Sequence, residues 1–391
     1  MKRKTGLFLI LITLILLAYC SFAYASSSGY LINDSSEYVR WTVDDDGNLE
    51  IFGNTYMPSY YDDNIVDSWW PNKQITSAWI HSGILNVSEY AFKNSSLKSI
   101  TLPSTLTYID PYAFSNSSLE SMMFHSRFTT IGEYAFSSCS KLKSLEIRNG
   151  VTKIYDCAFK ECPSLESIFV RHDNPCFCAV NNVLYSKDKT TLIKYPSGSS
   201  ATSFTIPEGV KVISPCAFDY SSNLESITVA STVETIASGA FAHCDNLKTV
   251  IFLGNAPSIN YVPQSPIYHE TDGMFSGDNL TAYYPIYDST WNTFVNSGYG
   301  GTVVWKNDPE KYLQYWNTLT LPDSLLEIHE YAFSNLACQA VIIPSNCQRI
   351  DQYAFSNCRF LRYVKVSQNT IIDSHAFDGC ESYIIDRYGS P

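Results

Sequence analysis

Charged side chains are scarce in this sequence. They make up 16% of the 391 residues, and acids outnumber bases, so that the formal net charge is −12. Apart from the first few residues, the chain has no cluster of Lys and Arg. Nucleic acids and anionic membranes are bound chiefly through clustered basic side chains. We therefore expect neither to be a partner of this protein.

Motifs for catalysis are also missing. The chain has no Gly-x-Ser-x-Gly nucleophile elbow, no His-Glu-x-x-His zinc motif and no phosphate-binding glycine loop. The run Asp-Asp-Asp-Gly at 44–47 suggests calcium, but an EF-hand loop would need a ligand at Thr42 and Glu at Gly53. We therefore expect a solvated turn here, and a non-catalytic protein with no catalytic residue, metal site or cofactor.

Long apolar runs are confined to the N-terminus. Basic residues at 2–4 are followed by an apolar run at 7–18 and by Ala-Tyr-Ala at 23–25, a small-x-small cleavage site. This order is typical of a secretory signal peptide, whereas a membrane anchor, the alternative, would need a longer run. We predict a signal peptide over residues 1–25, with cleavage after Ala25. The protein would then be secreted or held at the cell surface, without membrane insertion after signal removal.

What the sequence does have is an internal repeat. The dipeptide Ala-Phe occurs nine times, and within each block of copies the spacing is 22 or 23 residues. Two longer gaps mark insertions at about residues 172–203 and 254–318. A unit of this length cannot bury its own apolar side, but stacked units share a continuous core. The nine phenylalanines are Phe92, Phe114, Phe136, Phe159, Phe218, Phe241, Phe333, Phe355 and Phe377.

Each copy of Ala-Phe lies within the same apolar pattern, which residues 97–114 illustrate. Ile100 and Leu102 alternate with other residues as in a β-strand. Further along, the small Ala113 allows close packing and Phe114 fills the centre of the unit. We expect the strands of successive units to stack about 4.8 Å apart and to form a parallel sheet along one face.

The repeat pattern Leu-x-x-Ile-x-Leu-Pro-x-x-Leu-x-x-Ile-x-x-x-Ala-Phe-x-x-Cys resembles the BspA-like (Treponema-type) leucine-rich repeats over residues 79–391. The segment 174–196 is similar to that family's inserted hairpin, and 41–53 to its N-terminal cap, which we place at 26–78. The resemblance implies a leucine-rich-repeat solenoid. Its curved parallel β-sheet would consist of 22–23-residue repeats with short return strands or helical turns, a β-rich N-terminal cap and two insertions. It also implies a surface or secreted protein that adheres to host or matrix components.

The repeat register also places the cysteines. Five of the 12, Cys244 among them, stand three residues after a repeat Phe, a slot that Ser fills in other copies. We expect buried thiols there that act as small apolar residues. Secretion also permits disulfides, and neighbouring copies would place Cys139 beside Cys162 and Cys358 beside Cys380. Bridges within these two pairs are the alternative.

A solenoid of this kind usually binds its partners on the sheet face. Met123 and Phe169 are apolar at strand positions where exposure is expected, and just past the strands three successive copies carry basic residues. We predict a patch with an apolar centre and a cationic edge for an extracellular protein or glycan. Alternatively, an insertion covers the apolar residues and the charges are merely solvated. The candidate residues are Met123, His125, Glu146, Arg148, Phe169 and Arg171.

The second insertion is rich in aromatic residues, among them Trp291, Tyr299 and Trp305. They predict either a platform on which sugars stack or a small additional core beneath the insertion. For the whole chain we expect a secreted or cell-surface protein that mediates protein or glycan binding, as in adhesion. Two alternatives are a recruiting arm of an extracellular enzyme system and a structural component of a surface layer.

Overall fold

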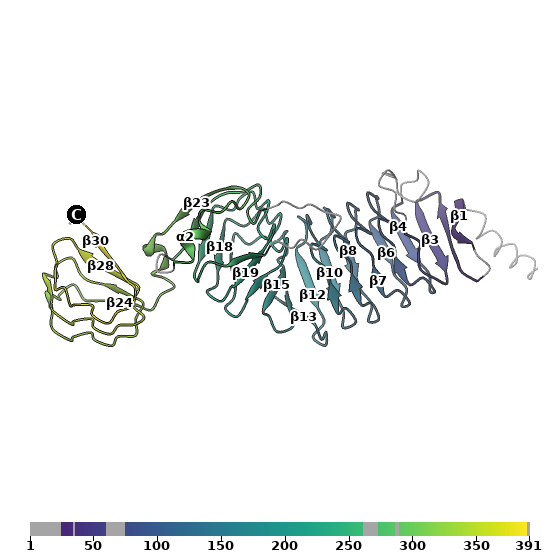
Figure 1. The fold of residues 1–391 in the computed structure, drawn as a ribbon. Helices are drawn as coiled ribbons and strands as arrows, with labels where there is room; N and C mark the ends of the chain where they lie inside the picture. The colour runs from purple at the N-terminus through teal and green to yellow at the C-terminus, as the bar shows by residue number, and fades with distance from the viewer. Residues whose placement is uncertain (1–24, 34–35, 60–74, 261–272, 286–288, 389–391) are drawn as a thin grey trace, which may run out of the picture.

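The computed structural model describes residues 25–33, 36–59, 75–260, 273–285 and 289–388. Nearly all of the predicted signal peptide, residues 1–24, lies outside these ranges. The described chain forms a parallel β-solenoid of about 13 turns, with repeats around 23 residues apart (Figure 1). The solenoid of stacked parallel strands predicted from the repeat is therefore confirmed.

The N-terminal cap is an antiparallel sheet of three strands, β1 (Ala25–Asn33), β2 (Tyr38–Asp44) and β3 (Asn48–Gly53). β3 then pairs in parallel with β4 (Ser77–Ile80), and β4 with β6 (Ser99–Thr101), so that the cap continues into the main sheet. In β2 and β3 every second residue is buried. This alternation is expected of strands that cover a core with one face.

Each turn contributes one strand to the main sheet and, on the return path, a shorter strand to a narrow second sheet. Along the face that we call the main sheet, the strands after β6 form three further hydrogen-bonded sheets. The first contains β8 (Ser121–Met123), β10 (Ser144–Ile147) and β12 (Ser167–Val170), the second begins with β16 (Ser203–Thr205), β18 (Ser226–Val229) and β20 (Thr249–Phe252), and the third contains β24 (Thr318–Thr320), β26 (Ala340–Ile342), β28 (Tyr363–Ser367) and β30 (Ile384–Tyr388). The second sheet contains β5 (Asn86–Val87), β7 (Tyr108–Ile109), β9 (Thr130–Ile131), β11 (Lys153–Ile154), β17 (Val212–Ile213), β19 (Thr235–Ala237), β21 (Ser258–Asn260), β25 (Glu327–Ile328), β27 (Arg349–Ile350) and β29 (Ile371–Ile372). Among the described residues, the helices are α2 (Trp291–Phe294) and the short 3-10 helix η1 (Pro309–Tyr312).

The first insertion is a β-hairpin. β13 (Phe177–Val180) and β14 (Val183–Ser186) pair antiparallel, and β15 (Thr191–Lys194) then pairs in parallel with β17. The second insertion contains further solenoid turns, because β22 (Asn279–Tyr283) and β23 (Thr302–Lys306) extend the main sheet beyond β20. Two of its aromatic residues face inward: Trp291 is fully buried, and Tyr299 lies in the same core as the neighbouring turns. These two residues therefore pack as core and do not form an exposed sugar platform.

The interior is organised around a column of stacked phenylalanines. Phe92, Phe114 and Phe136 are fully buried, and the centroids of neighbouring rings lie 5.2 Å apart. The backbone N–H of Phe114 donates to the carbonyl of Ala135 in the next turn at 2.8 Å, which fixes the register of the stack. Burying one such side chain stabilises the fold by about 1.5–3 kcal/mol, and each stacked pair adds roughly 1 kcal/mol.

In most turns two residues have a left-handed backbone. One directly precedes the repeat Ala and the other follows the repeat Phe by two positions, as Tyr112 (φ 57°) and Asn116 (φ 56°) show. Asn tolerates this region better than most residues, and glycine adopts it freely. This explains why Asn recurs at the second position and why Gly379 (φ 78°) occupies it in the last copy. The pair lets the chain turn sharply around the buried Phe.

The cysteines that follow the repeat Phe by three positions are free thiols, as predicted. Cys139 donates its S–H to the carbonyl oxygen of Phe114, in the preceding turn, at 3.1 Å. The slot therefore suits a small residue that can donate a hydrogen bond, and Cys and Ser both can. Neither Cys139 and Cys162 nor Cys358 and Cys380 are joined. The same contact, at 3.1–3.2 Å, is made by Cys162, Cys244, Cys358 and Cys380.

A disulfide that the sequence analysis missed joins Cys157 and Cys216 across the first insertion, with their Cα atoms 5.5 Å apart. Both residues directly precede a repeat Ala. Tyr112 and Tyr134 hold this position in earlier turns, where their rings stack 4.9 Å apart, and the disulfide packs against the same cluster. The repeat register could have identified the pair, because the looped-out hairpin makes the two turns neighbours.

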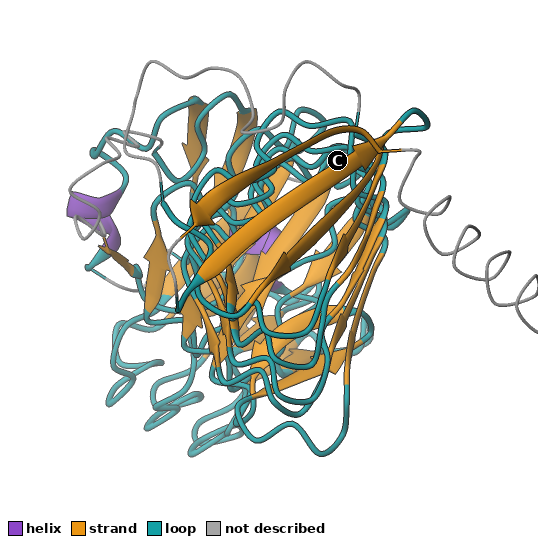
Figure 2. Cartoon of the chain, turned by 90° about the vertical axis from the view of Figure 1, so that its right-hand side faces the viewer, coloured by secondary structure: helices purple, strands orange, loops and turns teal. Residues whose placement is uncertain are grey.

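Three apolar cores follow one another along the chain. The buried residues of the first extend from Val39 to Leu184, those of the second from Val183 to Tyr299, and those of the third from Leu321 to Phe377. The C-terminal turns thus have a core of their own, and Figure 1 shows them (yellow) set off from the longer part of the solenoid. Seen from the end, the strands form the walls around the interior and the loops form its corners (Figure 2).

Candidate binding face on the main sheet

Three residues of the predicted patch lie side by side on the outer face of the main sheet. β8, β10 and β12 pair in parallel, so that Met123 is opposite Glu146 and Glu146 is opposite Phe169. Met123 is 56% exposed and Phe169 is 59% exposed, so the described parts of the insertions do not cover them. The residues that point inward from the same strands are buried: Met122, Leu145, Ile147, Ile168 and Val170.

Arg148 connects the members of this row. Its Nε donates to Glu146 Oε1 at 2.9 Å, and its Nη2 lies 3.2 Å from Met123 Sδ. A guanidinium that is already held by two neighbours loses less side-chain entropy when a partner binds. Arg148 is therefore a preformed polar anchor beside the apolar side chains.

The basic residues that follow the three strands provide less positive charge than predicted. Burial lowers the pKa of His125, and the nearby Arg127 and Arg148 lower it further, which favours the neutral ring. The predicted contribution of His125 to a cationic column is therefore weakened, and its role in the patch stays a prediction. Arg171 is exposed, but its Nε lies 3.5 Å from Asp173 Oδ1. Because Arg148 also contacts a carboxylate, both arginines of the predicted patch lie beside an acidic side chain.

The row extends toward the N-terminus through Trp79, which the sequence analysis did not include. Trp79 lies on β4 opposite Thr101 of β6 and is 51% exposed. Its indole stacks on the imidazole of His81 with ring centroids 4.1 Å apart, and His81 stacks on Phe52 at the same distance. The repeat register, which aligns residue 79 with Thr101, could have assigned Trp79 to the outer face.

Further contacts hold this aromatic cluster in place. The guanidinium of Arg40 lies over the Phe52 ring, 4.5 Å from its centroid, a contact that contributes roughly 0.5–1 kcal/mol at an exposed site. On the other side of the stack, His81 Nε2 lies 3.2 Å from Glu50 Oε2. The indole of Trp79 is therefore supported from beneath by ordered neighbours, while half of its surface stays accessible.

Exposed apolar side chains occupy every second strand of the row. Trp79 is on β4, Met123 on β8 and Phe169 on β12, whereas Thr101 and Glu146 occupy the strands between them. Neighbouring strands lie about 4.8 Å apart, so that successive apolar side chains are about 9.6 Å apart. We call these five residues the sheet-face row. Its regular spacing is the property that a partner would have to match.

Within the described ranges, no group of three or more His, Cys, Asp or Glu side chains is placed to hold a metal ion. In the acidic turn, Asp44 Oδ1 accepts the backbone N–H groups of Asp46 and Asn48, at 3.0 and 2.8 Å. These contacts are those of a side-chain-capped turn. In the part of the chain that the structure describes, no helix has the length and apolar character needed to cross a membrane.

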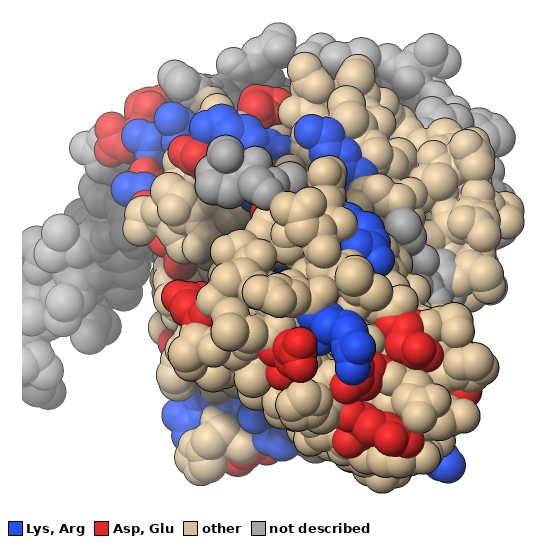
Figure 3. Space-filling view, turned by 90° about the vertical axis from the view of Figure 1, so that its left-hand side faces the viewer, with Lys and Arg blue, Asp and Glu red and all other residues tan. Residues whose placement is uncertain are grey.

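Charges at the C-terminal end of the solenoid are mixed. Figure 3 shows this end largely uncharged, with small groups of Lys and Arg next to Asp and Glu. Ion pairs account for some of them: Arg349 Nε lies 2.6 Å from Asp351 Oδ1, and Lys365 contacts Glu310. A surface of paired charges lacks the concentrated positive potential that binds phosphate backbones.

A solenoid of parallel strands built from such repeats is a leucine-rich repeat protein. The family model described as BspA type Leucine rich repeat region matches six copies in this chain, over residues 63–179, 194–265 and 311–386. Because the match covers more than half of the sequence, the chain belongs to the BspA-type leucine-rich repeat family.

Several solved structures resemble the chain over nearly its full length. A leucine-rich repeat protein from Eubacterium ventriosum is 24% identical with a TM-score of 0.50, and the alignment covers 93% of this chain and 97% of that one. The pneumococcal vaccine antigen PcpA is 17% identical (TM-score 0.41; 93% and 94% covered). A leucine-rich cell surface protein from Faecalibacterium prausnitzii is 19% identical (TM-score 0.32; 94% and 97% covered). At these identities the likeness concerns the fold alone. No curated protein matches the chain.

Proposed function

We propose that this chain is a secreted or cell-surface protein that binds an extracellular protein on the outer face of β4–β12, without catalysis. The observation that carries the proposal is the sheet-face row, in which Trp79, Met123 and Phe169 are each more than half exposed. Large apolar side chains that are aligned on a solvent-exposed surface are typical of interaction sites. The family supports a protein-binding role, and the signal peptide predicted at 1–25 supports export.

The side chains of the row favour a protein over a glycan. Aromatic residues, Met and Arg are enriched at the centres of protein interfaces, and the row combines Trp79, Met123 and Phe169 with Arg148. Met adapts its shape to a neighbouring side chain but offers no flat ring on which a sugar could stack. The preformed aromatic cluster at the Trp79 end and the guanidinium of Arg148, held between Met123 and Glu146, suit a partner of fixed shape.

The spacing of the row also indicates which structure the partner presents. An α-helix rises about 10.5 Å over seven residues, which return to nearly the same face, and this is close to the distance of about 9.6 Å between apolar side chains of the row. An extended peptide repeats its side-chain direction every second residue, about 6.6 Å or 13 Å along the strand, and fits poorly. We therefore assign the row to an amphipathic helix that lies across the strands.

A binding screen with matched variants tests this function. The purified chain would be passed over immobilised extracellular-matrix proteins and, separately, over glycans. We expect saturable capture by at least one protein, and a loss of affinity of tenfold or more, about 1.4 kcal/mol, in Trp79→Ala, Phe169→Ala and Arg148→Glu. Phe360→Ala is the matched control, because Phe360 is 60% exposed on the C-terminal turns, away from the row.

Three results would contradict the proposal. The row is not the binding face if its variants bind as well as the Phe360→Ala control. The partner class is wrong if only glycans capture the chain. If neither group captures it, the binding function itself is not supported.

A further inference from the structure

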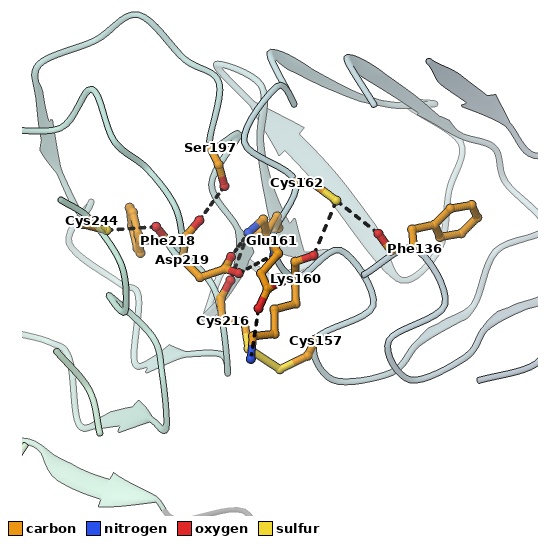
Figure 4. Close-up of polar contacts among 11 residues, drawn as sticks. Phe136, Cys157, Lys160, Glu161, Cys162, Ser197, Cys216, Phe218, Asp219 and Cys244 are labelled. Carbon is orange, nitrogen blue, oxygen red and sulfur yellow. Dashed lines mark hydrogen bonds and ion pairs between the residues drawn. A yellow bond between two sulfur atoms is a disulfide. The ribbon is translucent and has the colours of Figure 1, made fainter. Parts of the chain in front are cut away.

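A lysine, Lys194, and an aspartate, Asp219, are in contact inside the solenoid, at the junction between the inserted hairpin and the next turn. Figure 4 shows Asp219 with its labelled neighbours Glu161 and Cys216. Lys194 ends β15, and Asp219 directly follows the repeat residue Phe218. The Lys194 side chain is 4% exposed and the Asp219 side chain is 1% exposed, and Nζ of the first contacts Oδ1 of the second. The same Nζ donates to the carbonyl oxygen of Cys216 at 3.0 Å.

Other lysine–carboxylate pairs between neighbouring turns lie at the surface. In Lys211–Glu234 and Lys248–Glu225 more than half of each side chain is exposed, so that water solvates both charges. Two buried charges lack that solvation, and the desolvation penalty can exceed their mutual attraction. Transfer of one proton from the ammonium to the carboxylate removes both charges and leaves an amine beside a carboxylic acid.

The surroundings of Asp219 favour attack on its carboxyl carbon. The backbone N–H of Glu161 donates to Asp219 Oδ2 at 2.6 Å, in the way that a backbone donor polarises a carbonyl and stabilises the oxyanion formed on it. Burial raises the pKa of the Asp219 carboxyl, although Lys194 opposes this shift. A cavity of about 240 Å³, lined in part by Lys194, Lys160 and Cys216, gives a released water molecule a place to go.

We propose that Lys194 and Asp219 condense to an intramolecular amide. The Nζ lone pair attacks Asp219 Cγ, and the C–N bond forms as the C–OH bond breaks. One Nζ proton leaves with the departing hydroxyl as water, so that the reaction needs neither oxidant nor cofactor. Two groups held in contact in a dry interior have effective concentrations of roughly 10⁵ M or more, which compensates for the low reactivity of a free acid.

The amide would join two turns of the solenoid at the first insertion. At the first insertion the regular repeat is replaced by a hairpin, and Tyr195 takes the place of a repeat Phe by stacking on Phe218 with ring centroids 5.1 Å apart. The disulfide between Cys157 and Cys216 already joins the turns on the two sides of the hairpin. An amide from Lys194 to Asp219 would tie β15 to the same junction, because Asp219 lies three residues after Cys216.

Peptide mapping of the full chain tests the proposal without any variant. After reduction and alkylation, trypsin would normally cut after Lys194, but an acylated lysine is not cut. We expect the peptides 190–211 and 212–248 to be joined, at a mass lower than their sum by one water molecule. Recovery of 195–211 as a separate peptide in full yield would overturn the proposal.

Variants add a matched comparison. Asp219→Ala removes the acyl group and should restore cleavage after Lys194, whereas Glu234→Ala, at the exposed pair with Lys211, should leave the joined peptides intact. If the Asp219→Ala chain does not fold, the map of the unaltered protein still decides the question. Because the junction is separate from the sheet-face row, failure of this proposal would leave the proposed function untouched.

Discussion

Cys157 and Cys216 form a disulfide although 59 residues separate them in the sequence. Each occupies the position just before the repeat Ala, where Tyr112 and Tyr134 stack in earlier turns. The disulfide therefore links neighbouring turns at the repeat position where stacked tyrosine rings link them elsewhere. It does so where the inserted hairpin replaces the regular repeat.

Removal of this disulfide should weaken the fold. A covalent link across a loop of this length restricts the unfolded chain and stabilises the folded state by about 2–4 kcal/mol. We expect the double variant Cys157→Ser with Cys216→Ser to lose that much free energy of unfolding, measured by urea titration without reductant. Cys139→Ser is the control, because serine keeps a donor for the Phe114 carbonyl. In the presence of a reductant the unaltered protein should become as unstable as the double variant.

The thiols of the cysteine column should resist alkylation. Burial raises the pKa of Cys139 to about 11, although Ser117 opposes the shift, so that almost no thiolate exists at neutral pH. The thiolate is the reactive form. We expect iodoacetamide to label Cys139 and Cys162 only after unfolding, whereas the half-exposed Cys176 is labelled in the native protein, as peptide mapping would show. Equal labelling rates for Cys139 and Cys176 would contradict the assignment.

The sequence predicted the solenoid well because its repeat is local and regular. Ala113 and Phe114 recur at fixed spacing, and both are fully buried in the structure. The disulfide was missed because the two cysteines become neighbours only once the hairpin loops out. Trp79 was missed because it was assigned to the first residues of the solenoid without being aligned with the strand of the next copy.

For the binding face, the sequence predicted which side chains are exposed but not which groups surround each of them. Met123 and Phe169 are exposed as predicted from strand alternation. The charge of His125 could not be predicted, because it depends on how deeply the ring packs and on the guanidinium groups around it. The contact of Arg148 with Met123 also requires the exact separation of two strands, which the repeat fixes only approximately.

The left-handed residues of the turns should limit which substitutions the repeat accepts. Asn357 has φ 56° and is exposed, so that its side chain contributes little packing. Replacement by Val should destabilise the fold by roughly 1–2 kcal/mol, because an L-residue with a branched side chain is strained in this region. Asn357→Gly should be tolerated, because glycine adopts positive φ without strain. Thermal unfolding of both variants would test this, and equal melting temperatures would contradict it.

Asp278 should make stability depend on pH. It stands three residues after Phe275, in the slot that cysteines hold in other copies, and it is buried. Burial raises its pKa to about 8, and Asp245 adds to the shift. The folded state therefore keeps the proton up to about pH 8, whereas the unfolded chain releases it near pH 4. Between these values the free energy of unfolding should fall as pH rises, by at most about 1.4 kcal/mol per pH unit.

The variant Asp278→Asn isolates this effect, because asparagine has nearly the same shape and no charge to lose. We expect urea titrations between about pH 5 and pH 8 to show a flatter pH dependence in Asp278→Asn than in the unaltered protein, since the variant no longer takes up a proton on folding. Asp323→Asn, at an exposed position, should keep the original slope. If Asp278→Asn keeps that slope too, the carboxyl is ionised in the folded protein and the buried slot tolerates a charge.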